Sequence, residues 1–226
     1  YETLFPYTTL FRSPQTRASV LPNGIDVARW RRPEGLADVT VPPLRIVAAQ
    51  RMVRRKRPDA VIDLLLRARE LVPSGIVLQA EVVGDGPARE GLVRRLEVDG
   101  VDWISLPGRV TRKQLRDLHW RSHVFVSAAR LEAFGIAALE ARTAGLALVV
   151  REGTGARDFV SMGLSGLLAD TDDGLAEAVA RLATRPTLLA KLQQHNRRVP
   201  PAEDWPIVVK STVAEYRRAQ QQATVR

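Results

Sequence analysis

The feature that most constrains the fold of this chain is an alternation of short apolar runs with longer segments of helical period. Most of the runs are apolar at every position, which is typical of strands in a sheet that is covered on both faces. Strands that alternate with helices favour a doubly wound parallel sheet, in which ligands bind beyond the carboxyl ends of the strands. The predicted strands are 44–49, 77–84, 102–108, 123–128, 146–150 and 166–169, and the predicted helices are 57–72, 88–98, 111–121, 135–144, 173–183, 186–196 and 206–222.

The composition narrows the classes of partner. The chain has 226 residues, a formal net charge of +9 and no cysteine. Its three histidines share no ligand-like spacing, so we expect no metal site. A positive balance suits anionic partners, which include nucleic acid, an acidic membrane surface and a nucleotide diphosphate. No apolar run approaches the ~20 residues that a membrane-spanning helix needs, and we expect a soluble chain.

The opening segment, YETLFPYTTLFRS, differs in composition from the rest of the chain. Residues 3–13 resemble the conceptual translation of a sequencing-library adapter, so we expect 1–13 to be non-native and 14–226 to form one ligand-binding domain. The alternative is a genuine irregular arm. The first hypothesis also predicts that the natural protein begins further upstream and that this chain is a truncated fragment of it.

Two of the predicted strands are followed by loops that could receive an anion. The loop AAQRMVRRKRPD carries Arg51 and Lys56, which could meet two phosphates, although such a cluster is more often a solvated loop or a nucleic-acid contact. The other basic side chains there, Arg54, Arg55 and Arg57, are expected to face water. The loop GDGP contains Gly84, where backbone could approach a ligand, but on its own it is more often an ordinary turn.

The stretch RLEAFGIAALEAR follows the strand 123–128. The first free amides of the helix that it begins, near Phe134 to Ile136, favour an anion, and carboxylates beside that anion could accept hydrogen bonds from sugar hydroxyls. Glu132 and Glu140 are the candidates, although this spacing alone equally suits a surface helix. After the strand 146–150, Asp158 could cap a short helix or contact a ligand, and capping is favoured.

The ordered set of these segments resembles one known family. VLPNGID, AAQRMVRRKRP, VVGDGP, LPGRV, SAARLEAFGIAALEA and REGTGARDFV follow one another as in the C-terminal donor-binding domain of retaining GT-B glycosyltransferases of the family-4 (glycosyl transferases group 1) type. The resemblance runs from about residue 20 to the end of the chain. It implies a Rossmann-like doubly wound parallel sheet, which is the C-terminal half of a GT-B fold, and an acceptor-binding N-terminal domain that is missing here.

The resemblance also implies roles for individual residues. Arg51 and Lys56 match the residues that neutralise the donor diphosphate, Glu132 the contact to the transferred sugar, and Glu140 the contact to the ribose hydroxyls. Stabilisation of the leaving diphosphate by cations implies chemistry that needs no metal or other cofactor. The remaining matched positions are Phe134, Gly135 and Ile136, which turn backbone toward phosphate and sugar, and Gly84 and Val110, which receive the nucleotide end.

The chain departs from the family pattern at several positions. Gln50 and Arg57 replace usual glycines, which puts the conformation of their loop in doubt, and Asp158 replaces a usual glutamate. Ala128 and Ala129 replace a usual Pro-Ser. Without its N-terminal domain the fragment is expected to bind donor poorly and to transfer nothing.

The expected function is hexosyl transfer from a nucleotide-diphosphate sugar to a glycan, lipid or small-molecule acceptor, with no nucleic-acid partner. The expected location is the cytoplasm, with peripheral contact to the inner face of the membrane through the missing domain as a further option. One alternative is a basic nucleic-acid-binding α/β module, which the net charge favours. The other is a GT-B relative such as a sugar-nucleotide epimerase or a phosphorylase-like enzyme.

Overall fold

The computed structural model describes residues 21–36 and 41–224. The predicted non-native segment, 1–13, lies outside the described residues. The chain divides into two compact units. One is Ile25–Ala202, and the described residues 21–24 and 203–224 belong to the other.

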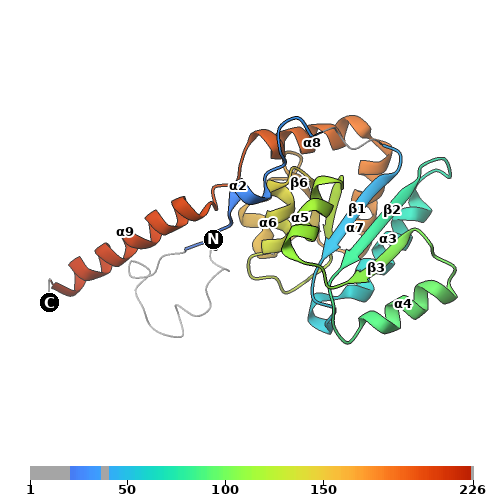
Figure 1. Ribbon diagram of the computed structural model, residues 1–226, viewed down its shortest axis with the longest axis horizontal. Coiled ribbons are helices and arrows are strands. Elements are labelled where there is room, and N and C mark those ends of the chain that lie inside the picture. The colour runs from blue at the N-terminus through green and yellow to red at the C-terminus, as the bar shows by residue number, and fades with distance from the viewer. Residues whose placement is uncertain (1–20, 37–40, 225–226) are drawn as a thin grey trace. The chain divides into compact units, whose positions relative to one another are not determined.

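Ile25–Ala202 is built around a sheet of six parallel strands in the order β3-β2-β1-β4-β5-β6. Figure 1 shows β1, β2 and β3 side by side. All six predicted strands are present, with ends within two residues of those expected. The strand order reverses between β1 and β4, which defines the switch point of a doubly wound sheet. The strands are β1 (Leu44–Ala49), β2 (Leu78–Val83), β3 (Ile104–Gly108), β4 (Val124–Ser127), β5 (Ala147–Arg151) and β6 (Gly166–Ala169).

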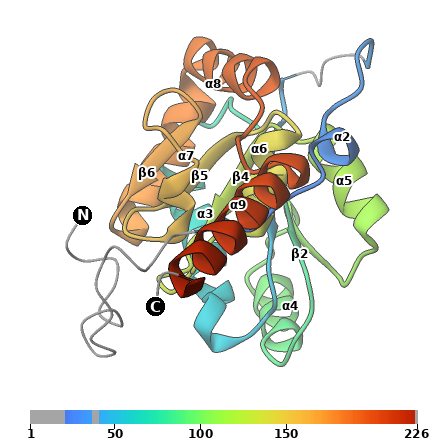
Figure 2. The same cartoon turned by 90° about the vertical axis from the view of Figure 1, so that its left-hand side faces the viewer.

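Helices cover both faces of this sheet. Residues of α3, α4, α7 and α8 pack in the core on one face, and residues of α2, α5 and α6 in the core on the other. Figure 2 shows α2 and α5 side by side, and the indole N–H of Trp120 at the end of α5 donates to the carbonyl of Trp30 at the end of α2 at 3.0 Å. The helices are α2 (Val27–Trp30), α3 (Pro58–Leu71), α4 (Arg89–Val98), α5 (Arg112–Trp120), α6 (Ile136–Thr143), α7 (Asp172–Thr184) and α8 (Pro186–Arg198), with short 3-10 helices η2 (Arg54–Lys56) and η3 (Gly155–Asp158).

The two-sided cover explains why the strands are apolar throughout. In β1, Ile46 and Ala48 belong to the core beneath α3, and Val47 belongs to the opposite core. In β5, Val149 faces the first core and Leu148 the second. Successive side chains of a strand point to opposite faces, so a sheet buried on both faces needs apolar residues at both.

The second unit contains the predicted C-terminal helix, α9 (Trp205–Thr224), which extends slightly beyond the expected 206–222. Among residues 21–36 and 41–224, none of the helices combines the length and the apolar content that crossing a bilayer requires.

Candidate functional site

A groove of about 630 Å³ lies beyond the carboxyl ends of β1, β2 and β3, between these strands and the helices α5 and α6. We call it the strand-end groove. It is where a doubly wound sheet is expected to bind its ligand. Its walls include Arg51, Gly84, Gly86, Arg109, Val110 and Ala137.

Two glycines allow the loops after β1 and β2 to pack backbone against backbone. Gly84 has φ of 132°, and a Cβ there would lie 1.8 Å from the carbonyl oxygen of Gln50. Gly86 has φ of 148°, and a Cβ there would lie 2.6 Å from the carbonyl oxygen of Met52. The loops are joined by the Met52 amide, which donates to the carbonyl of Asp85 at 2.8 Å. No other residue type fits these two positions, so GDGP is a constrained part of the groove wall.

Two arginines, against one acid, Asp85, make the described lining of the strand-end groove electropositive. Arg51 and Arg109 are both exposed, and neither forms a hydrogen bond or ion pair with a side chain that the structure describes. The sequence interpretation placed Arg51 here and missed Arg109. The signal for Arg109 was its position directly after the strand 102–108, which brings it to the same edge of the sheet. Unpaired guanidinium groups in a concave site favour an anionic ligand.

Lys56 and Glu132 form an ion pair, with 2.5 Å between Nζ and Oε2. Both side chains are mostly buried, with exposed fractions of 17% and 25%. The Glu132 side chain lies beside Gly135, which has φ of 90° and is the N-cap of α6. The structure thus brings together three of the predicted site residues, Lys56, Glu132 and Gly135. Arg51 lines the strand-end groove, in the loop after β1 that also carries Lys56.

The first turn of α6 has no side-chain cap. Its N-cap, Gly135, has no side chain to accept from the first amides, as expected from the stretch RLEAFGIAALEAR. Phe134 is buried against Phe159, with 5.6 Å between the ring centroids, so it anchors the turn, whereas Ile136 is exposed. Ala137, in the same turn, lines the strand-end groove. The uncapped end of the helix therefore lies at the groove.

Glu140 lies one turn further along α6 and is only 4% exposed. Burial raises the pKa of its carboxyl group to about 7, against the opposing effect of Arg112 and Arg29. Arg112 donates to Oε1 of Glu140 at 2.7 Å and lies over the ring of Trp30, 5.5 Å from its centroid. Glu140 does not itself line the groove. Its partner Arg112 begins α5, which contributes Leu115 to the groove wall.

The prediction that Arg57 faces water is wrong. Its guanidinium donates to both carboxylate oxygens of Asp172, at 2.9 and 2.6 Å, and to the carbonyl of Ala128 at 3.0 Å. Arg57 also has φ of 54°, a left-handed conformation. The backbone therefore keeps the conformation that the family's usual glycine allows, and the new side chain ties the β1 loop to the start of α7. Arg54 and Arg55 are exposed, as expected.

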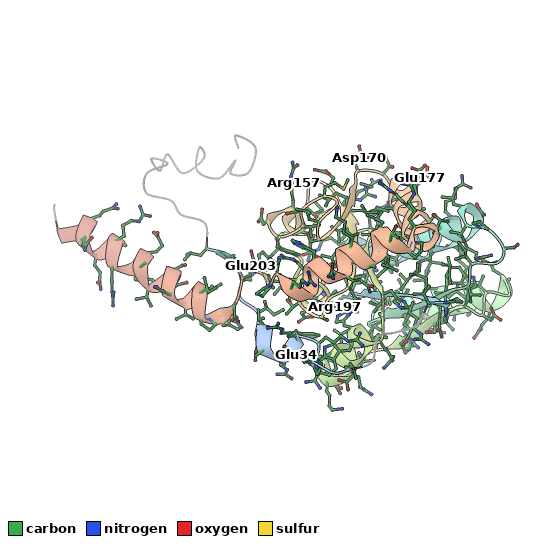
Figure 3. The ribbon with its side chains drawn as sticks, turned by 90° about the horizontal axis from the view of Figure 1, so that it is seen from above. Glu34, Arg157, Asp170, Glu177, Arg197 and Glu203 are labelled. Carbon is green, nitrogen blue, oxygen red and sulfur yellow. The ribbon has the colours of Figure 1, made fainter. Side chains whose placement is uncertain are left out.

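The prediction that Asp158 caps a short helix is also wrong. Gly155 begins the helix, as expected, but Asp158 is the last residue of η3 and is exposed, and η3 has no side-chain cap. The neighbouring Arg157 pairs with Glu152 at 2.7 Å and lies at the periphery of the unit (Figure 3). This turn places polar side chains at the surface, and its glycine is needed because a Cβ at Gly155 would lie 2.0 Å from the carbonyl oxygen of Ala133.

Histidine and acidic side chains do not form a metal-binding cluster anywhere in the part of the chain that the structure describes. His119 is fully buried between Trp30 and Phe125, with ring centroids 5.6 and 6.2 Å away. Burial lowers the pKa of His119 to about 3, so it is a neutral member of the core.

The fold and the groove define a Rossmann-like α/β domain with an electropositive site at the carboxyl edge of its sheet. The family described as Glycosyl transferases group 1 matches residues 41–199, and the chain belongs to this family. The resemblance predicted from the sequence is thereby confirmed.

Curated relatives match nearly all of the chain. It is 30% identical over 226 residues to D-inositol 3-phosphate glycosyltransferase of Rhodococcus erythropolis, a match that covers 93% of this chain and 50% of that protein. It is 27% identical over 215 residues to a phosphatidylinositol N-acetylglucosaminyltransferase subunit of Arabidopsis thaliana, covering 93% and 46%. The chain therefore spans about half the length of these relatives.

Solved structures support the same fold. A glycosyltransferase from Rickettsia africae superposes with a TM-score of 0.74 at 16% identity, covering 92% of this chain and 59% of that one. Anabaena HepE, solved in complex with UDP-glucose, superposes with a TM-score of 0.69 at 18% identity, covering 90% and 57%. The predicted fold, a Rossmann-like sheet that forms one half of a GT-B fold, is confirmed.

Proposed function

We propose that this chain binds the nucleotide-diphosphate sugar of a retaining, metal-independent hexosyltransferase. The observation that carries the proposal is the strand-end groove, with the unpaired Arg51 and Arg109 in its wall and the Lys56–Glu132 pair beside it. Family membership and the relatives, which are named as glycosyltransferases, support transfer of a sugar. One neighbour in fold was solved with UDP-glucose, which supports a nucleotide sugar as donor.

In this proposal the nucleotide occupies the strand-end groove. Its base end lies against the backbone of Gly84 and Val110, which the groove wall exposes. Glu140 accepts hydrogen bonds from the ribose hydroxyls once Arg112 shares or releases the Glu140 carboxylate. A carboxylate serves this purpose better in its ionised form, because charged acceptors form the stronger hydrogen bonds.

The diphosphate lies toward Arg51, Lys56 and the uncapped first turn of α6. The acceptor oxygen bonds to the sugar carbon as the bond between that carbon and the phosphate oxygen breaks, and the acceptor proton passes to the leaving phosphate oxygen. The electron pair of the broken bond stays on the diphosphate, and the negative charge that develops there is stabilised by the two cations and the helix amides. These groups supply the stabilisation without a metal ion or other cofactor. Glu132, held beside Gly135, contacts the sugar hydroxyls.

The acceptor is a glycan, a lipid or a small molecule. Because nucleotide sugars are cytoplasmic metabolites, we propose that the protein acts in the cytoplasm, with contact to the inner face of the membrane when the acceptor is a lipid. Analysis of the products made by a full-length relative of this chain would distinguish transfer with retention from inversion, and from epimerisation of the donor.

The direct test is titration of the chain with UDP and GDP, followed by thermal unfolding. A nucleoside diphosphate that binds the native state raises the melting temperature. The Glu140→Gln variant should bind more weakly by about 1.5–3 kcal/mol because a charged acceptor is lost. Glu90→Gln, at an exposed position of α4, is the control and should bind normally. Absence of any shift with millimolar UDP or GDP in the folded chain contradicts the proposal.

A further inference from the structure

A second groove, of about 770 Å³, has a different set of described lining residues from the strand-end groove. It is formed by η2, by the first two turns of α3 and by the loop between β4 and α6. Ala60 and Leu131 supply its apolar walls. We call it the arginine groove, and its charged side chains are Arg54, Arg55, Arg57, Asp59, Asp63 and Arg130.

The charges of the arginine groove do not cancel. Asp172 already neutralises Arg57 through a bidentate pair, and Arg95 neutralises Asp63 at 2.8 Å. The other three arginines, Arg54, Arg55 and Arg130, are exposed, and their side chains form no hydrogen bond or ion pair with any residue that the structure describes. Among the described acids of the groove, only Asp59 likewise lacks such a partner. Three cations against one anion leave the groove positive.

The chemistry of the groove suits a phosphate group. Guanidinium groups bind phosphate with paired hydrogen bonds, and the positive end of the α3 dipole adds to their field. Recognition of single-stranded nucleic acid needs aromatic side chains on which bases stack, and none of the described residues that line this groove is aromatic. The ligand is therefore a compact phosphate-bearing molecule, and the size of the groove is typical of a small-molecule site.

The arginine groove adjoins the Lys56–Glu132 pair. Lys56 lies between Arg55 and Arg57 in the chain, and Glu132 directly follows Leu131, so the same two segments build the groove and the ion pair. A molecule held by its phosphate in this groove therefore lies next to Lys56 and Glu132. In the proposed function the donor approaches the same pair from the strand-end groove. Ala137, in the first turn of α6, lines that groove, and Gly135 at the start of the same turn lies beside Glu132.

We propose that the arginine groove binds the phosphate group of the acceptor, carried either by a soluble molecule or by a phospholipid headgroup, as a second contact beside those that the resemblance assigns to the N-terminal domain. This inference rests on the proposed function, because only a transferase has an acceptor. Phosphate recognition at this place orients an acceptor hydroxyl toward the reacting sugar, and it gives the three unpaired arginines a role distinct from that of Arg51.

The test compares two triple variants of the whole chain that lose the same charge. The first removes the groove arginines through Arg54→Ala, Arg55→Ala and Arg130→Ala. The control removes three exposed cations that have no partner among the described residues and lie at the far end of α7 and on α8, through Arg181→Ala, Arg185→Ala and Lys191→Ala. The probes are glycerol phosphate, measured by calorimetry, and vesicles of phosphatidylglycerol in phosphatidylcholine, measured by sedimentation, both at about 0.15 M salt to screen non-specific attraction.

We expect the groove variant to bind one or both probes at least about tenfold more weakly than the control variant, since each lost guanidinium removes a charge-assisted bond. Loss of glycerol phosphate binding identifies a soluble acceptor, and loss of vesicle binding alone identifies a lipid. Equal binding by the two variants, or no binding of either probe by the unmodified chain, overturns the inference. Arg130→Ala alone repeats the comparison with the smallest change.

Titration of the same samples with UDP and GDP separates this inference from the proposed function. The groove variant should keep the nucleotide affinity of the control, because its substitutions lie outside the strand-end groove. Parallel loss of nucleotide and phosphate binding shows a single shared anion site and overturns the inference. Absence of nucleotide binding by every sample refutes the proposed function, while a selective loss of phosphate binding in the groove variant still establishes the groove as a phosphate site.

Discussion

Glu140 is a residue at which stability and the proposed function oppose each other. Its side chain is almost fully buried in α6, and burial raises the pKa of its carboxyl group from 4.5 to about 7. The ionised form that would bind ribose hydroxyls is therefore disfavoured in the folded chain. Glu140→Gln keeps the shape of the side chain and removes the ionisation, so it should stabilise the protein above pH 7 while weakening the donor site.

The sign and size of this change in the free energy of unfolding follow from proton linkage. Below pH 4.5 the carboxyl group is neutral in both the folded and the unfolded chain. Between pH 4.5 and 7 the unfolded chain releases its proton first, so the free energy of unfolding falls as pH rises, and above pH 7 the loss is complete. A shift of this size corresponds to about 3 kcal/mol. The advantage of Glu140→Gln over the unmodified chain should therefore grow by about 3 kcal/mol from pH 4 to pH 8.

Urea unfolding at half-unit pH steps measures this difference, with Glu90→Gln as a control because the Glu90 side chain is 81% exposed. The control should differ from the unmodified chain by a nearly constant amount across the series. If the difference for Glu140→Gln is as constant as that for the control, the carboxyl group of Glu140 titrates normally and the reasoning about its burial is refuted.

Two further substitutions test local features of the site. Arg57→Gly and Arg57→Ala both lose the pair with Asp172, but only glycine relieves the strain of the positive φ. In urea unfolding the glycine variant should therefore be more stable than the alanine variant by about 1 kcal/mol. The opposite order would contradict the left-handed conformation of residue 57. Arg112→Gln removes the larger of the two cationic influences that oppose the rise in the pKa of Glu140, so the midpoint of the pH-dependent fall in stability should move to higher pH. An unchanged midpoint would show that the two side chains do not interact in solution.

The strands were predictable because their signal is local and strong. A strand buried on both faces, such as β5, needs an apolar residue at every position, and that pattern is visible in the sequence without knowledge of its neighbours. The exact ends were not predictable, because they depend on which backbone groups find a partner in the next strand. β3, for example, begins at Ile104 and not at 102.

Side-chain partners were less predictable because they join distant parts of the chain. Arg57 and Asp172 are 115 residues apart in the sequence, and Arg112 and Glu140 are 28 residues apart, so no local sequence pattern predicts either pair. One signal was present for Arg57. The family resemblance places it where glycine is usual, which indicates a left-handed backbone, and the structure shows that conformation. That signal could not predict that the guanidinium group of Arg57 binds Asp172.

The most direct test of the central claim is a map of backbone amide chemical shifts in the chain on titration with UDP and with GDP. The claim is that the nucleotide lies in the strand-end groove, with its diphosphate at the start of α6. It predicts that the largest shift changes are at Gly84, Val110 and residues 135–137, and that the same amides report the same affinity. Shift changes confined to η2 and the loop containing Arg130, with none at Gly84 or Val110, would contradict it.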